Sequence, residues 1–150
     1  MIRHAEAVAE TLVVHDPHRP LTAHGRIQAR ALGDRLRWHD CHPTHVWSSP
    51  LVRAIQSAEL VVSHLHCEVP VDVVPALAPD GNIRDVVAAL RALAPPSVVV
   101  LVGHEPSLSA IGALLVGTRD FDALAKAEAV RIVNGALRWR FAWNADAPDR

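Results

Sequence analysis

Apolar residues recur at the spacing of an α-helix in four stretches of the chain. Because three or four positions separate them, the apolar residues of each stretch share one face that can be buried. In the first stretch, this spacing predicts that Ile27, Ala31, Leu32 and Leu36 face the core. Pro50 is expected in the first turn of the second helix, where proline is tolerated. The predicted helices cover residues 23–38, 51–65, 83–93 and 108–115.

Shorter apolar runs between these helices predict β-strands at 45–49, 71–74 and 97–102. The third contains Val98 to Val102, an unbroken run typical of a central strand covered on both faces. Two further runs, 129–133 and 136–141, flank Asn134-Gly135, a strong two-residue hairpin signal. The alternation predicts a three-layer α/β/α sandwich with a mostly parallel central sheet and an antiparallel C-terminal hairpin. We expect one domain over residues 1–150, with 144–150 as a flexible tail.

The charge balance narrows the classes of partner. The chain has 15 Lys+Arg against 16 Asp+Glu, a net charge of −1, which gives no general attraction to nucleic acid or to an anionic membrane. No 18 apolar residues run together, and no apolar segment marks a secretory signal. Two cysteines do not make a disulfide framework. We therefore expect a monomeric cytoplasmic protein that binds neither nucleic acid nor membrane.

Ten histidines in 150 residues raise the question of a metal site. His39, Cys41 and His42 form one cluster, and His64, His66 and Cys67 form another at the end of a predicted helix. Their spacings match no closed zinc pattern, and histidines are favoured at helix C-termini by the helix dipole. The sequence therefore predicts no metal and no cofactor.

Polar residues gather where the predicted strands end. Arg3-His4 stands at the start of the chain, Ser48-Ser49-Pro50 precedes Arg53, and Gly103-His104-Glu105-Pro106 follows the central strand. Ligands of open α/β sheets bind beyond the carboxyl ends of the strands. Guanidinium groups and helix N-termini match the geometry of phosphate. These positions predict an oxyanion pocket.

The same residues carry a resemblance to a known family. Arg3-His4-Ala5-Glu6-Ala7, Arg19 to Gly25, Ser48 to Ala58 and Gly103-His104-Glu105-Pro106 resemble, in this order, the motifs of the histidine phosphatase (phosphoglycerate-mutase-like) superfamily, and most of all its small SixA-type phosphohistidine phosphatases. The resemblance implies that His4 is the nucleophile and forms a phosphohistidine. It also implies that Arg3, Arg53 and His104 hold the phosphoryl oxygens, with Arg19 at the rim of the pocket.

Two positions depart from the family pattern. Ala5 stands where the first motif commonly has glycine. The first strand of the family normally carries several apolar residues before Arg-His, whereas only Met1 and Ile2 precede them here. We expect either that the true start of the chain lies upstream of Met1 or that the first strand is stunted and the domain less stable.

The general acid of mutase and phytase relatives has no clear counterpart. Asp80, Glu105 and Glu6 are candidates, although Asp80-Gly81 is equally a turn pair. Without a strong acid, the site favours an activated phosphate such as phosphohistidine, because imidazole leaves more easily than an alkoxide.

These observations predict a phosphatase in signal transduction that acts on a protein phosphohistidine, for example on a histidine-containing phosphotransfer domain. The alternatives are a small-molecule phosphomonoesterase of the same superfamily and a non-catalytic phosphate-binding module.

Overall fold

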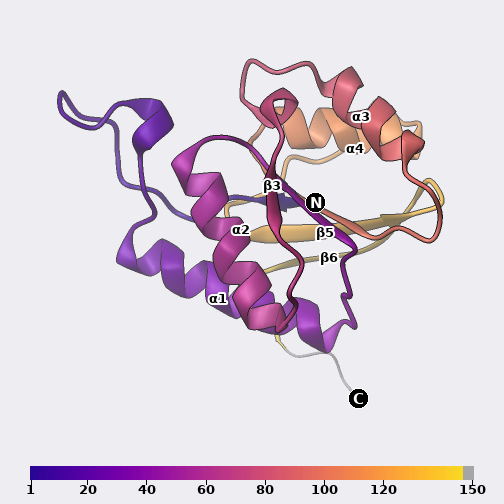
Figure 1. Ribbon diagram of the computed structural model, residues 1–150, viewed down its shortest axis with the longest axis horizontal. Coiled ribbons are helices and arrows are strands. Elements are labelled where there is room, and N and C mark those ends of the chain that lie inside the picture. Colours follow the sequence, from indigo (N-terminus) through magenta and orange to yellow (C-terminus); the bar gives the residue numbers. More distant parts are fainter. Residues whose placement is uncertain (147–150) are drawn as a thin grey trace.

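The computed structural model describes residues 1–146, which form a six-stranded sheet between two pairs of helices (Figure 1). The strands are β1 (Ile2–Arg3), β2 (His45–Ser48), β3 (Val71–Val73), β4 (Val99–Gly103), β5 (Glu128–Val133) and β6 (Ala136–Ala142). The helices are α1 (Ala23–Trp38), α2 (Val52–Leu65), α3 (Ile83–Ala92) and α4 (Ser107–Val116). Short 3-10 turns lie at Asp16–His18 and Pro75–Leu77. None of the helices within residues 1–146 is both long and apolar enough to cross a membrane.

The sheet has the strand order β3-β2-β4-β1-β5-β6. The first four of these strands pair in parallel, and β5 and β6 add the antiparallel C-terminal hairpin. Asn134 (φ 50°) and Gly135 (φ 73°) both take the left-handed conformation at the turn. Two such residues in succession give the type I′ turn, whose twist fits the flanking strands. The predicted mixed sheet and its hairpin are confirmed.

Side chains point alternately to the two faces of the sheet, and each face is covered by one pair of helices. Val46, Val100 and Val102 point to one face and pack with α1 and α2. Trp47 and Leu101, on the intervening positions, point to the other face and pack with α3 and α4. Because successive side chains of a strand face opposite sides, one buried strand such as β4 supplies both cores.

The buried face of α1 differs from the prediction. Ile27 is 54% exposed, whereas Gln28 is buried. The side-chain Oε1 of Gln28 accepts a hydrogen bond from the Glu6 N–H (2.9 Å), because α1 covers a backbone segment whose polar groups need partners. The first turn of α1 lies so close to that segment that a Cβ on Gly25 would stand 2.0 Å from the Glu6 carbonyl oxygen. Pro50 also differs, since α2 begins at Val52.

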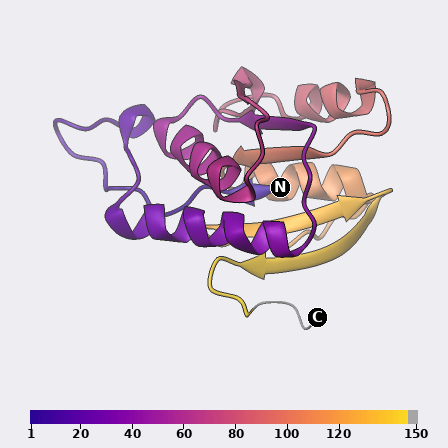
Figure 2. The ribbon, with the colours of Figure 1, turned by 60° about the horizontal axis from the view of Figure 1, so that its bottom comes forward.

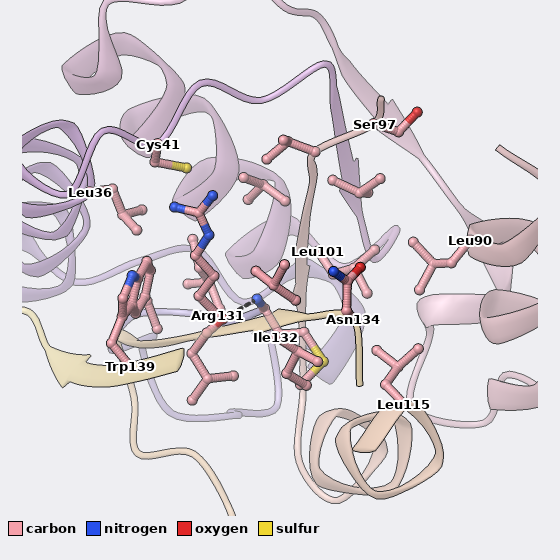
Figure 3. A pocket seen from close by; sticks show the side chains of 18 of the residues that line it. Leu36, Cys41, Leu90, Ser97, Leu101, Leu115, Arg131, Ile132, Asn134 and Trp139 are labelled. Carbon is pink, nitrogen blue, oxygen red and sulfur yellow. Dashed lines mark hydrogen bonds between the residues drawn. The ribbon is translucent and has the colours of Figure 1, made fainter. Parts of the chain in front are cut away.

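The strand β1 is only two residues long. Ile2 pairs with Val102 of β4 and with Ala129 of β5. The Met1 ammonium donates to the Val130 carbonyl (2.7 Å), and the Val130 N–H donates to the Met1 carbonyl (2.9 Å). Beyond Met1, the space between β4 and β5 is a mainly apolar cavity of about 440 Å³ (Figure 3).

The C-terminal end of the chain continues from β6 as a turn, in which the Ala145 N–H donates to the Ala142 carbonyl (3.0 Å). Of the tail expected over 144–150, residues 147–150 lie outside the described residues.

Candidate active site

His4 directly follows β1, at the carboxyl end of the parallel strands. Its backbone N–H donates to the Gly103 carbonyl (3.1 Å), which extends the pairing with β4. The ring Nδ1 lies 2.7 Å from the Ala5 carbonyl oxygen. Because a carbonyl oxygen only accepts, the proton of the neutral ring is on Nδ1 and the lone pair is on Nε2.

The surroundings of His4 keep its ring neutral. Burial is the main reason that the pKa of His4 is lowered to about 3, and the positive charges of Arg53 and Arg3 act in the same direction. The Ala5 carbonyl raises this pKa, but by less. At pH 7, the His4 ring is therefore neutral, and its Nε2 carries a lone pair and no proton.

Arg53 is the second residue of α2, and its side chain is buried beside His4. Its Nε–H donates to His4 Nε2 (3.3 Å), which agrees with a lone pair at that atom. One turn later, the Ser57 hydroxyl donates to the Arg53 carbonyl (2.7 Å) and accepts from the Ala5 N–H (3.0 Å). The start of α2 thus fixes both the arginine and the backbone that follows His4.

His104 directly follows β4, and its ring centroid lies 5.1 Å from that of His4. The Ser49 hydroxyl accepts from the Leu51 N–H (3.3 Å), and His104 Nε2 (2.7 Å) is the one acceptor among the described residues that its hydrogen reaches. This places the proton of the neutral His104 ring on Nδ1. Burial lowers the pKa of His104 to about 4, and the charge of Arg53 adds to that effect.

Two buried nitrogen atoms at this place have no hydrogen-bond partner among the described residues. They are Nε of Arg3 and Nδ1 of His104. Arg3 uses another nitrogen, Nη1, to donate to the Leu124 carbonyl (2.9 Å), which orients its side chain. Buried donors in proteins are nearly always satisfied. Two N–H groups of this kind are suited to the oxygens of a bound oxyanion.

The loop before α1 contributes Asp16 and Arg19. Arg19 donates to Asp16 Oδ1 through Nε (3.0 Å) and Nη2 (2.7 Å). Arg53 Nη1 donates to the Asp16 carbonyl (2.8 Å), and its Nη2 lies 3.4 Å from Asp16 Oδ2. Burial raises the pKa of Asp16, but the hydrogen bonds and charges of the two arginines outweigh burial and hold it below its usual value.

All these side chains line one cavity of about 370 Å³. Four cationic groups, two imidazoles and two carboxylates border it, namely Arg3, Arg19, Arg53, Lys126, His4, His104, Asp16 and Glu105. The structure thus brings together Arg3, His4, Arg53, His104 and Arg19, as the sequence predicts. Asp16 and Lys126 were missed. The signal for Asp16 was a carboxylate three positions before Arg19, and Lys126 gave none.

The three candidate proton donors lie in different surroundings. Glu105 lines the cavity, but its Oε1 accepts from the Leu124 N–H (2.9 Å) and its Oε2 from the Ser109 hydroxyl (2.6 Å). Glu6 accepts from the Thr22 hydroxyl (2.7 Å) and is not part of the cavity wall. Asp80 is exposed in a turn, and only its neighbour Pro79 reaches the cavity.

The two histidine-cysteine clusters are occupied by other contacts. His39 stacks on Phe141 (centroids 4.5 Å apart), and His64 Nδ1 pairs with Asp34 Oδ1 (3.1 Å). Within residues 1–146, no three His, Cys, Asp or Glu side chains are placed to hold a metal ion.

Comparison with known proteins agrees with this arrangement. Residues 1–78 match the histidine phosphatase superfamily (branch 1). Over 108 residues, the chain is 34% identical to an uncharacterized protein of Picosynechococcus sp. and 32% identical to the phosphohistidine phosphatase SixA of Escherichia coli (strain K12). These stretches cover 71% of this chain and 65% and 66% of the two relatives, so the chain spans just under two thirds of their length.

The fold is also that of a solved relative, the protein histidine phosphatase SixA complexed with tungstate. The two structures superpose with a TM-score of 0.84 at 27% identity, over 95% of this chain and 94% of that one. This likeness confirms the predicted fold class and the SixA-type resemblance. Since the superfamily match covers 78 of 150 residues, this chain belongs to the histidine phosphatase superfamily (branch 1).

Proposed function

We propose that this chain is a phosphatase that works through a phosphohistidine formed on His4. The observation that carries the proposal is the pair of buried N–H groups without protein acceptors, Arg3 Nε and His104 Nδ1, in two residues that line the same cavity as His4. The likeness to a solved SixA that holds tungstate, a tetrahedral oxyanion, supports phosphate as the ligand.

In the first step, the lone pair of His4 Nε2 attacks phosphorus, and the bond from phosphorus to the leaving group breaks. The His4 ring then carries a positive charge, which its Nδ1–H shares with the Ala5 carbonyl oxygen. Arg3, Arg53 and His104 donate hydrogen bonds to the phosphoryl oxygens as the transferring group flattens. Positioning and charge stabilisation are what phosphoryl transfer chiefly requires of a protein.

In the second step, a water molecule attacks the phosphorus of the phosphohistidine. The bond to Nε2 breaks, its electron pair returns to the His4 ring, and the protons of the water stay on the phosphate product or pass to solvent. His4 is restored with its proton still on Nδ1. Four cationic side chains border the cavity, so these steps use no metal ion.

The surroundings favour a phosphoramidate over a phosphate ester. Both oxygens of Glu105 already accept hydrogen bonds, and the arginines keep Asp16 ionised. An alkoxide leaving group gains about 10²- to 10⁴-fold from a general acid, which these carboxylates do not offer. A phosphohistidine whose second ring nitrogen is protonated departs as neutral imidazole without help. The E. coli relative is named a phosphohistidine phosphatase, which supports the same substrate class.

The test compares three substrates: a histidine-phosphorylated phosphotransfer domain, free phosphohistidine and p-nitrophenyl phosphate. We expect the highest kcat/KM with the phosphoprotein, a phosphoenzyme that is labile in acid and stable in alkali, and no activity in His4→Ala. His42→Ala, a change at an exposed histidine outside the cavity, is the matched control.

Other results would point to the alternatives. Faster turnover of p-nitrophenyl phosphate than of either phosphohistidine would indicate a small-molecule phosphomonoesterase. Phosphate binding without turnover in the unaltered protein would indicate a binding module.

A further inference from the structure

The loop 8–20 projects from the body of the protein and carries an apolar tip. Both ribbon views show it (indigo to purple) standing clear of the sheet and helices (Figures 1 and 2). At its far end, Leu12 is 99% exposed and Val13 is 88% exposed, more than any other large hydrophobic residue described. Single exposed apolar side chains are ordinary, but two adjacent ones at the end of a projecting loop mark a contact surface.

The tip is held in this exposed conformation by its own hydrogen bonds. The Thr11 N–H donates to the Val14 carbonyl (2.9 Å), and the Thr11 hydroxyl oxygen accepts from the N–H groups of Val14 (2.9 Å) and Val13 (3.3 Å). This turn places both apolar side chains at its outer end. The pair is therefore presented to solvent by a formed turn.

The base of the loop is fixed to the active site. Ala7 and Leu21 form an antiparallel bridge, and the Val8 N–H donates to the Pro20 carbonyl (2.9 Å). Nearer the cavity, the Asp16 carbonyl accepts from Arg53 Nη1 (2.8 Å). Asp16 is four positions after Leu12, so the tip lies within about 14 Å of the cavity wall along the chain. A contact at the tip and a phosphoryl group at His4 are thus within reach of one folded partner.

The wall of the cavity adds a charge. Lys126 is exposed there and lines the cavity. It is placed by Ala127, whose N–H donates to the carbonyls of Arg3 and His4 (both 3.2 Å). A partner that covers the cavity would thus meet both a cation in the cavity wall and the nearby apolar tip.

We propose that Leu12 and Val13 form a docking tip for the folded protein that carries the phosphohistidine. This proposal rests on the proposed function and deepens it, because it assigns the preference for a protein substrate to a surface outside the catalytic cavity. The partner surface next to the phosphohistidine is apolar where it meets the tip and acidic where it meets Lys126. A free phosphohistidine fits within the cavity and makes no contact with the tip.

The test is a double variant, Leu12→Ser with Val13→Ser, assayed on a histidine-phosphorylated phosphotransfer domain and on free phosphohistidine. We expect kcat/KM for the phosphoprotein to fall about tenfold or more, mainly through KM, as for the loss of an interface anchor. The value for free phosphohistidine stays unchanged. Leu137→Ser, which removes a half-exposed leucine from β6, is the matched control and leaves both values unchanged.

Three results would overturn the docking tip. Equal activity of the double variant and the unaltered protein on the phosphoprotein would show that the tip makes no contact. An equal fall on both substrates would show that the loop only supports Asp16 and Arg53. If sedimentation shows a dimer for the unaltered protein and a monomer for the double variant, the tip binds a second copy of the chain instead. Failure of the proposed function is distinct, because the unaltered protein would then hydrolyse neither phosphohistidine substrate.

Discussion

Two cavities lie at opposite ends of the central strands, and the larger of these two is not the candidate active site. The cavity beyond Gly103 measures about 370 Å³ and is bordered by four cations, two imidazoles and two carboxylates. The cavity beyond Met1 measures about 440 Å³ and is lined mostly by aliphatic side chains, with Arg131 and Cys41 on one side (Figure 3).

The difference has a structural cause. The first cavity lies where β1 and β4 end together and where α2 begins, so backbone and side-chain donors converge there. The second lies between residues 99–101 of β4 and 131–133 of β5, which have no strand between them in the part of the chain that the structure describes. Volume alone therefore does not identify a functional site, whereas converging hydrogen-bond donors do.

The largest expected effect is on kcat/KM, in a comparison of alanine substitutions at one arginine from each cavity. Arg53→Ala removes the guanidinium group beside His4, and we expect kcat/KM on phosphohistidine to fall about 10²- to 10³-fold. Arg131→Ala, the same change in the apolar cavity, should leave kcat/KM within about twofold. Steady-state kinetics of the two purified variants decides. Similar losses in both would remove the functional distinction between the cavities.

The second prediction concerns the close packing behind His4. Gly25→Ala would place a Cβ 2.0 Å from the Glu6 carbonyl oxygen, so α1 has to move away from that segment. We expect the free energy of unfolding to fall by about 2–3 kcal/mol in urea denaturation. Gly103→Ala is the control, because its nearest contact would be an ordinary 3.4 Å. Equal stability of the two variants would contradict the close approach.

The third prediction is a pH dependence that the two histidines of the polar cavity cause. The pKa values of His4 (about 3) and His104 (about 4) lie below the ordinary 6.5, so the unfolded chain binds more protons below pH 6.5. Stability is therefore complete above pH 6.5 and is lost as the pH falls toward 4 and 3, at about 1.4 kcal/mol per pH unit for each group. His4→Gln should reduce this slope in denaturation series, and His42→Gln should not. Retention of the full slope in His4→Gln would contradict the assignment.

The smallest effect concerns the apolar cavity. Four apolar residues added before Met1 would continue β1 between β4 and β5, and a peptide N–H would replace the buried ammonium at Val130. Burial lowers the pKa of that ammonium to about 6, so its contribution is lost as the pH falls from 8 to 6. We expect the extension to add about 1–2 kcal/mol at pH 7 and to remove this loss. The control is the same extension with a proline in it, because proline cannot donate to a neighbouring strand. An equal gain in the free energy of unfolding from both extensions would contradict strand pairing.

Much of the fold follows from local patterns. The span 23–38 and the turn at Asn134-Gly135 were predictable because helix periodicity and left-handed turn residues act over a few positions. Ile27 was placed wrongly because burial on α1 depends on a distant backbone N–H, that of Glu6, which required Gln28 there.

Some residues of the candidate site were also predictable from local patterns, and others were not. His4, Arg53 and His104 were predictable because each stands next to the end of a strand or the start of a helix. Asp16 reaches Arg53 only through an irregular loop, and Glu105 binds the distant Leu124 backbone. Neither contact has a periodic signal in the sequence.

Lys126 has a practical consequence. It is the only lysine in the chain. A reagent that is selective for lysine side chains thus has a single target, in the wall of the polar cavity. A fluorophore attached there would report occupancy of the cavity, whereas coupling to a solid support through this lysine would immobilise every molecule with its active site facing the surface.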